Sequence, residues 1–134
     1  MTVCTKDRKP VFWEDVAADT IRQDTQLLSG IGRIAEQAVN QIPQYYPGVA
    51  VDKYAIMPDH IHAILRIETD SQGQKVSNAT ISTVVGQMKR WVTKRIGMSV
   101  WQKSFIDRVI RNEQEYLAIW EYIDNNPRKF LGGG

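Results

Sequence analysis

The sequence predicts an α+β fold of the ferredoxin-like type, in which an antiparallel sheet carries helices packed on one face. Three observations support this prediction. Segments rich in β-branched residues alternate with segments whose apolar residues recur every three or four positions. Two strand-like segments follow each other with only a short turn between them, as in a hairpin. The chain has 134 residues, which suits a single core. The resulting order is β-α-β-β-α-β-α. We expect one domain over residues 1–131 and a flexible glycine tail at 132–134.

The first half is predicted to hold a strand, a helix and the hairpin. The opening TVCT alternates β-forming residues and predicts a short strand. Apolar residues at helical spacing predict a helix within about residues 14–42, and the prolines that follow end it. Residues 49–57 and 60–67 predict two strands, because both are rich in β-formers and a Pro-Asp turn separates them.

The second half is predicted to hold a helix, a strand and a last helix. Residues 77–96 carry an apolar stripe at helical spacing, with the basic residues on other faces. Residues 100–111 are strand-like in composition. Asn112 is a suitable cap for a helix that starts at Glu113. We expect this helix to end at Asn126, because the proline that follows cannot continue it.

The composition excludes several classes of protein. Cys4 is the only cysteine, so an internal disulfide is impossible and the reducing cytoplasm is the expected compartment. No apolar run approaches the roughly 18–20 residues of a membrane span. The first residues have no apolar segment of the kind that a secretory signal needs.

Positive charge is concentrated in one part of the chain. Residues 71–112 hold eight lysines and arginines against one aspartate, a net charge of +7, whereas the segments before and after carry −3 and −2. Such a distribution is typical of a surface that binds a polyanion. A solvated helix face without any partner accounts for the charge equally well.

The chain's only two histidines stand in the stretch MPDHIHAILRI. Residues two apart share one face of a strand, so His60 and His62 point the same way and can converge on one metal ion. By itself this spacing is weak evidence, because surface or hydrogen-bonded histidine pairs are common. A structural zinc site needs four Cys or His ligands, and this chain has three such residues in total. A histidine-triad hydrolase needs further histidines, and the chain has none. A serine or cysteine nucleophile remains open, with Cys4, Ser77 or Ser104 as candidates.

The last helix supplies a second pair of polar residues. Tyr122 and Asn126 are four positions apart, so they lie about one turn from each other on one helix face, beside the apolar stripe. A half-buried aromatic and a helix cap explain each residue singly. The joint occurrence of the two histidines, this pair and the basic segment between them is much more specific.

At these residues the sequence resembles the single-tyrosine HUH transposases, named for two histidines that flank a hydrophobic residue. It is most similar to the REP-associated tyrosine transposases and the insertion-sequence-200-like proteins around them. The matching segments occur in order along nearly the whole chain: TVCTKDRKPVF, YAIMPDHIHAIL, VVGQMKRWVTKRI and VWQKSFIDRVIRNEQEYLAIWEYIDNNPRKF. One departure is Asp59, where the family commonly has asparagine, and a turn should tolerate it.

The resemblance implies an enzyme that cuts and rejoins single-stranded DNA at hairpin-associated sites through a 5′-phosphotyrosine intermediate. It implies that Tyr122 is the nucleophile and that His60, His62 and Asn126 bind a divalent metal, Mg²⁺ or Mn²⁺. It also implies hairpin DNA as partner, a homodimer in part of the wider group, and a bacterial protein at the nucleoid. Two alternatives remain: a domesticated module that binds DNA or RNA hairpins without cutting, and a metallo-phosphoesterase that uses water in place of Tyr122.

DNA binding is expected along the basic segment, mainly through phosphate contacts. Trp101 is the better candidate for stacking on unpaired bases, since Trp91 falls in the apolar stripe of its helix. The basic residues expected to bind DNA are Lys89, Arg90, Lys94, Arg95, Lys103, Arg108 and Arg111.

Overall fold

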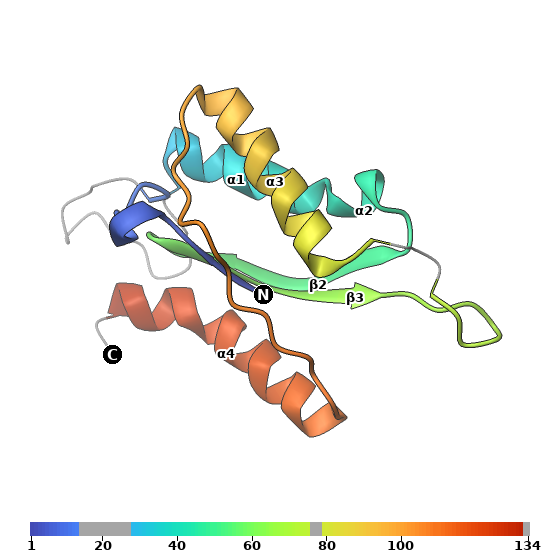
Figure 1. The fold of residues 1–134 in the computed structure, drawn as a ribbon. Helices are drawn as coiled ribbons and strands as arrows, with labels where there is room; N and C mark the ends of the chain where they lie inside the picture. Colours follow the sequence, from blue (N-terminus) through green and yellow to red (C-terminus); the bar gives the residue numbers. More distant parts are fainter. Residues whose placement is uncertain (14–27, 76–78, 133–134) are drawn as a thin grey trace.

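Within the described residues the sheet has three regular strands, with the histidine-bearing strand in its centre. The structure, a computed structural model, describes residues 1–13, 28–75 and 79–132, the last seven of them as backbone only. Strands β1 (Thr2–Cys4), β2 (Val49–Ile56) and β3 (His60–Ile67) form an antiparallel sheet in the order β1-β3-β2 (Figure 1). This arrangement confirms the predicted α+β class, the hairpin and the pairing that the ferredoxin-like order requires.

The predicted strand at 100–111 is present only as an irregular segment beside β1. Thr2 exchanges backbone hydrogen bonds with Ile106, at 2.7 and 2.8 Å, and Thr5 forms a second isolated bridge with Trp101. Between these two bridges the chain advances three residues along β1 but five residues along the segment at 100–111. The two segments are therefore out of register, and a continuous ladder cannot form. The expectation of a fourth regular strand is wrong, although the segment lies at the sheet edge where that strand was expected.

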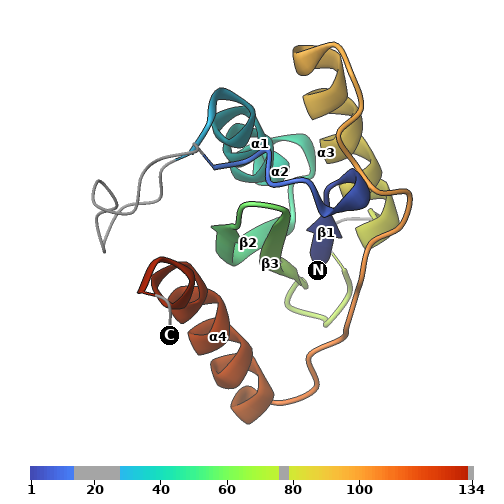
Figure 2. The ribbon, with the colours of Figure 1, turned by 90° about the vertical axis from the view of Figure 1, so that its left-hand side faces the viewer.

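Helices α1 (Gly30–Asn40), α2 (Ile42–Tyr45) and α3 (Ile81–Ile96) cover one face of the sheet (Figures 1 and 2). Side-chain oxygens cap two of them: Ser29 accepts from Gly32 at the start of α1, and Thr80 accepts from Thr83 at the start of α3. The predicted helix stretches at 14–27 and 77–78 lie outside the described residues.

The main core lies between this face and the three helices. Its buried members include β3's Ile61 and, on α3, much of the predicted stripe. The largest fully buried side chains of the described residues are Phe12, Ile42, Ile56, Ile61, Met88, Val3, Val39, Val49, Val84, Val85, Val92 and Thr5.

Helix α4 (Glu113–Gly132) packs on the opposite face of the sheet, where it contacts β2 and β3 (Figure 2). The prediction of helices on one face therefore holds only for α1–α3. The physical reason is a second, smaller apolar cluster formed by Ala55, Ile64 and Ile123. Ala55 and Ile64 point away from the main core, and α4 shields them from water.

The ends of α4 show one prediction confirmed and one wrong. Asn112 caps the helix as expected, since its side-chain oxygen accepts from the Glu115 N–H at 2.8 Å. The helix continues past Asn126 through Pro127 to Gly132. A proline removes one backbone donor and crowds the preceding turn, but the remaining hydrogen bonds can carry a helix across it. No helix of the described residues is both long and apolar enough to span a membrane.

Candidate functional site

The two histidines converge on the face of the sheet that α4 covers. His60 and His62 are two residues apart on β3, so their imidazoles share that face. Their Nε2 atoms lie 3.0 Å apart, and the ring centroids are separated by 4.5 Å. Two nitrogens bound at right angles to one metal ion at about 2.1 Å are also about 3.0 Å apart, so the imidazole pair fits a shared divalent ion.

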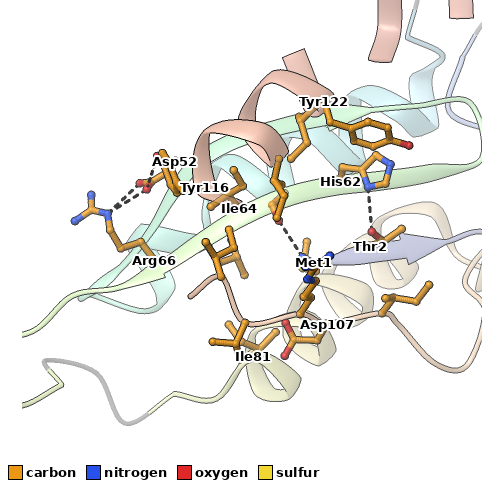
Figure 3. A pocket seen from close by; sticks show the side chains of 18 of the residues that line it. Met1, Thr2, Asp52, His62, Ile64, Arg66, Ile81, Asp107, Tyr116 and Tyr122 are labelled. Carbon is orange, nitrogen blue, oxygen red and sulfur yellow. Dashed lines mark hydrogen bonds and ion pairs between the residues drawn. The ribbon is translucent and has the colours of Figure 1, made fainter. Parts of the chain in front are cut away.

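Each imidazole is oriented by a partner at its other nitrogen. Nδ1 of His60 lies 2.6 Å from the Asp59 carboxylate, and Nδ1 of His62 lies 3.0 Å from the Thr2 hydroxyl (Figure 3 shows the second pair). Arg8 donates from Nε to the other carboxylate oxygen of Asp59 at 2.9 Å. Partners of this kind fix the ring orientation of metal-binding histidines.

The electrostatic setting keeps the imidazole of His62 neutral and the carboxylate of Asp59 charged. Burial, together with the neighbouring His60, lowers the pKa of His62 from 6.5 to about 4. Burial alone would raise the pKa of Asp59, but the hydrogen bonds from His60 and Arg8 outweigh it and lower that pKa. A neutral imidazole is the form that binds metals, so His62 is ready to act as a ligand at neutral pH.

Tyr122 reaches this site from α4. Its ring centroid lies 5.5 Å from that of His62, in an edge-to-face arrangement (Figure 3). The side chain is 54% exposed, whereas the next residue, Ile123, is buried against the sheet. Tyr122 therefore stands at the rim of the helix–sheet contact, where a substrate can reach its hydroxyl. The prediction that it lies beside the apolar stripe is confirmed.

Polar contacts with β2 also hold α4 in place. Lys53 forms an ion pair with Asp124 at 2.7 Å and lies 4.2 Å from the centre of the Trp120 ring. The Tyr116 hydroxyl donates to Asp52 at 3.0 Å. These contacts fix the position of the helix and, through it, of Tyr122.

A groove of about 660 Å³ runs along the sheet from this site. Its floor is β3, and its walls are α4 and the segment at 106–110 (Figure 3). His62 and Tyr122 line it together with apolar side chains such as Ile64 and Ile119. Tyr122 is therefore reached from an open groove that follows the sheet.

Asn126 lies on α4 one turn beyond Tyr122, as predicted, but its side chain is outside the described part of the chain. Its role as third ligand therefore stays a prediction. Among the side chains that are described, no group of three or more His, Cys, Asp or Glu is placed to hold a metal ion.

The basic residues that are predicted to bind DNA differ in how accessible they are. Lys89 is used within the protein, because its ammonium donates to the Gln102 carbonyl at 2.8 Å and burial lowers its pKa. Arg108 pairs with Glu115 at 2.8 Å, yet its side chain is still 73% exposed. The remaining predicted cations are exposed on α3 and the segment after it: Arg90, Lys94, Arg95, Lys103 and Arg111.

The prediction that Trp101 stacks on bases is wrong for the protein as folded. Trp101 is only 7% exposed, packs against Phe12 at 5.5 Å between ring centroids, and donates from Nε1 to the Lys89 carbonyl. A ring enclosed in this way has no free face for a base. Trp91 is the more accessible of the two, and the Arg95 guanidinium lies 4.5 Å from its ring centre.

Sequence reasoning missed the residues that orient the imidazoles. Asp59 directly precedes His60, so its carboxylate could have been predicted as a partner of that ring. Arg8 and Thr2 could not, because only the pairing of β1 with β3 brings them to the histidines.

Comparison with known proteins gives the family. The family model described as "Transposase IS200 like" matches residues 1–126. The chain is 32% identical over 146 residues to an uncharacterized protein from Haemophilus influenzae (strain ATCC 51907 / DSM 11121 / KW20 / Rd), covering 95% of this chain and 78% of the relative. The fold is an α+β domain with a sheet covered by helices, and the family match shows that the chain belongs to the IS200-like transposase family.

A solved structure shares the fold. It is a REP-associated tyrosine transposase bound to a REP hairpin, with a TM-score of 0.65 and 21% identity over 96% of this chain. The present chain spans 65% of the length of that protein. The likeness confirms the fold class that the sequence predicts.

Proposed function

We propose that this protein is a metal-dependent endonuclease and strand transferase that acts on single-stranded DNA next to hairpins. One observation supports the proposal most directly. The aromatic ring of Tyr122, on the last helix, lies 5.5 Å from the ring of His62, on the central strand. Folding thus places a tyrosine from the last helix beside two imidazoles from the central strand. The chain that carries this arrangement belongs to the IS200-like transposase family.

The proposed reaction is a phosphoryl transfer to tyrosine. The Tyr122 hydroxyl oxygen forms a bond to the phosphorus as the bond to the 3′ oxygen breaks, and the released strand leaves with a 3′-OH. The other strand stays attached as a 5′-phosphotyrosine, so the 3′-OH can later reverse the step without ATP. The exposure of Tyr122 at the rim of the groove suits a polymeric substrate.

His60, His62 and Asn126 would hold the divalent ion. When bound, it would supply positive charge to the non-bridging phosphate oxygens. Two imidazoles and an amide oxygen form a mixed donor set, so Mn²⁺, which accepts both donor types, should serve at least as well as Mg²⁺. The paired Nε2 atoms at 3.0 Å are consistent with this assignment.

Hairpin DNA is the proposed partner. The exposed cations on and after α3 provide phosphate contacts, and a protein of the same fold has been solved with a REP hairpin. Tyr122 lies beside His62 of its own chain, so the expected homodimer is not needed to bring these two residues together.

The test is a covalent adduct between protein and DNA. With Mn²⁺ and a hairpin-bearing single strand, we expect a product that survives denaturing electrophoresis, and Tyr122→Phe should abolish it. Tyr116→Phe is the matched control, because this second tyrosine of α4 is hydrogen-bonded to Asp52 and should not attack. An adduct that persists in Tyr122→Phe refutes the assignment of the nucleophile.

Other outcomes identify the alternatives. Cleavage without any adduct would indicate a metallo-phosphoesterase that uses water. Hairpin binding without cleavage, unaffected by a chelator, would indicate a domesticated DNA- or RNA-binding module. A cysteine nucleophile is disfavoured, because Cys4 is buried.

A further inference from the structure

Arg8, Asp59 and His60 form a continuous line of polar contacts beside the two imidazoles. The Arg8 Nε donates to Asp59 Oδ2 at 2.9 Å, and Asp59 Oδ1 lies 2.6 Å from His60 Nδ1. Both oxygens of the carboxylate are therefore engaged. The His60 side chain is 15% exposed and that of Asp59 is 25% exposed, so their contact is largely shielded from water.

The loop that carries Arg8 has an uncommon backbone conformation. Asp7 and Arg8 both have positive φ, at 56° and 55°, a region that non-glycine residues seldom adopt. Thr5, which is 1% exposed, ties this loop to the turn before β3. Its hydroxyl lies 2.7 Å from the Lys9 carbonyl and 3.2 Å from the Asp59 carbonyl, and its N–H donates to the same Asp59 carbonyl at 2.9 Å.

We propose that Arg8 and Asp59 are positioning residues that set the tautomer of His60. An ionised carboxylate can only accept hydrogen bonds, so His60 must carry its proton on Nδ1. Its Nε2 then presents a lone pair towards His62. Arg8 holds the carboxylate in the orientation that this contact requires. The inference rests on the proposed function only in taking the two Nε2 atoms as the metal-binding atoms.

His62 has a different kind of partner. The Thr2 hydroxyl beside its Nδ1 can donate or accept, so this contact fixes no tautomer. Of the two partners, only the Asp59 carboxylate therefore selects a tautomer.

Nitrogen-15 NMR of the metal-free protein near neutral pH tests the tautomers directly. The chain has only two histidines, so only two imidazole spin systems occur, and a His62→Gln variant assigns them. We expect His60 to be protonated on Nδ1. In Asp59→Ala, His60 should lose its preference for the Nδ1 form. In Asp59→Asn the preference should also weaken, because the amide has one acceptor oxygen where the carboxylate has two, and the Arg8 N–H competes for it.

Mn²⁺ binding, measured by the paramagnetic resonance of the free ion, gives a second readout. Loss of a hydrogen-bond partner behind a metal-binding histidine typically weakens binding about 10–100-fold, and we expect this in Asp59→Ala. Arg8→Ala keeps the carboxylate acceptor at His60 and should lose less. Arg66→Ala is the matched control, because it removes a similarly exposed Arg–Asp pair that does not contact the imidazoles.

The outcomes separate this proposal from the proposed function. If His60 in Asp59→Ala keeps the Nδ1 form and binds Mn²⁺ as tightly as before, positioning by Asp59 is refuted. Equal losses in Arg66→Ala and Asp59→Ala would also refute it, since the effect would then not depend on the carboxylate beside His60. If the tautomers follow the expectation but no variant binds Mn²⁺, the positioning role stands and the metal-dependent function fails.

Discussion

The helix that carries Tyr122 joins the sheet through an apolar cluster of its own. Ile123, which is 3% exposed, packs there with Ala55 and Ile64, and none of these three belongs to the main core. We therefore expect Ile123→Ala to weaken the docking of α4 while the main core stays intact. This contact matters for the proposed activity, because docking brings Tyr122 to His62.

The size of the effect follows from the carbon atoms removed. Isoleucine to alanine deletes three side-chain carbons, at about 0.8 kcal/mol each when buried, which gives about 2.4 kcal/mol. The cavity left behind adds to this, and measured Ile→Ala changes span about 2–5 kcal/mol. The cluster lies between one helix and the sheet, where side chains can relax, so we expect about 2.5 kcal/mol. That corresponds to a roughly 50–100-fold rise in the undocked population of α4.

Native-state amide hydrogen exchange measures this directly. In Ile123→Ala the amides of α4 should exchange faster by that factor, whereas those of α1 and α3 should keep their rates. Leu117→Ala is the control, because Leu117 lies on the same helix but is 52% exposed. Equal acceleration in α1, α3 and α4 would show that the helix opens only when the whole domain unfolds, and the separate-cluster reasoning would be wrong.

Three further outcomes are expected. Trp101→Ala should lower the free energy of unfolding by about 3–5 kcal/mol in urea titrations, because the indole ring is buried. The hairpin affinity of the folded variant should be unchanged, and a specific loss of that affinity would contradict the burial of the ring. The metal-free protein should lose about 1–2 kcal/mol of stability as the pH falls from about 6.5 to about 4, because the unfolded chain takes up a proton at His62 before the folded one does; contact of the ring with solvent makes this less than the full shift. His62→Gln should flatten that profile, and an unchanged profile would assign the loss to other groups. Arg90→Ala and Lys94→Ala should each reduce the salt dependence of hairpin binding by about one unit of slope if they contact phosphates, whereas Lys89→Ala should mainly reduce stability.

The features that follow from local patterns could be read from the sequence. The alternation along β3 placed His60 and His62 on one face, and the side chain of Asn112 caps the last helix as its position indicates. Both depend only on residues close together in the chain, where the periods of helix and strand are decisive.

The failures concern contacts between distant segments. Trp101 was expected at the surface, but its indole packs on Phe12 and bonds to the carbonyl of Lys89, and no local pattern encodes those partners. The segment around it has strand-like residues, yet a mismatch of three steps against five prevents a ladder with β1. The position of α4 did leave a signal, because Ile64 and Ala55 are apolar residues on the face assigned to the site.

The position of β1 in the sheet has a consequence for biosynthesis. β1 is translated before β2 and β3, but it lies between β3 and the segment that reaches Ile106. The ribosome must therefore add about a hundred further residues before both edges of β1 are covered, and until then Val3 has no complete apolar environment. Pairing between segments far apart in the sequence forms more slowly than the local contacts of a helix. A nascent chain with an unpaired strand edge and exposed apolar side chains is prone to aggregate, and chaperones bind such chains.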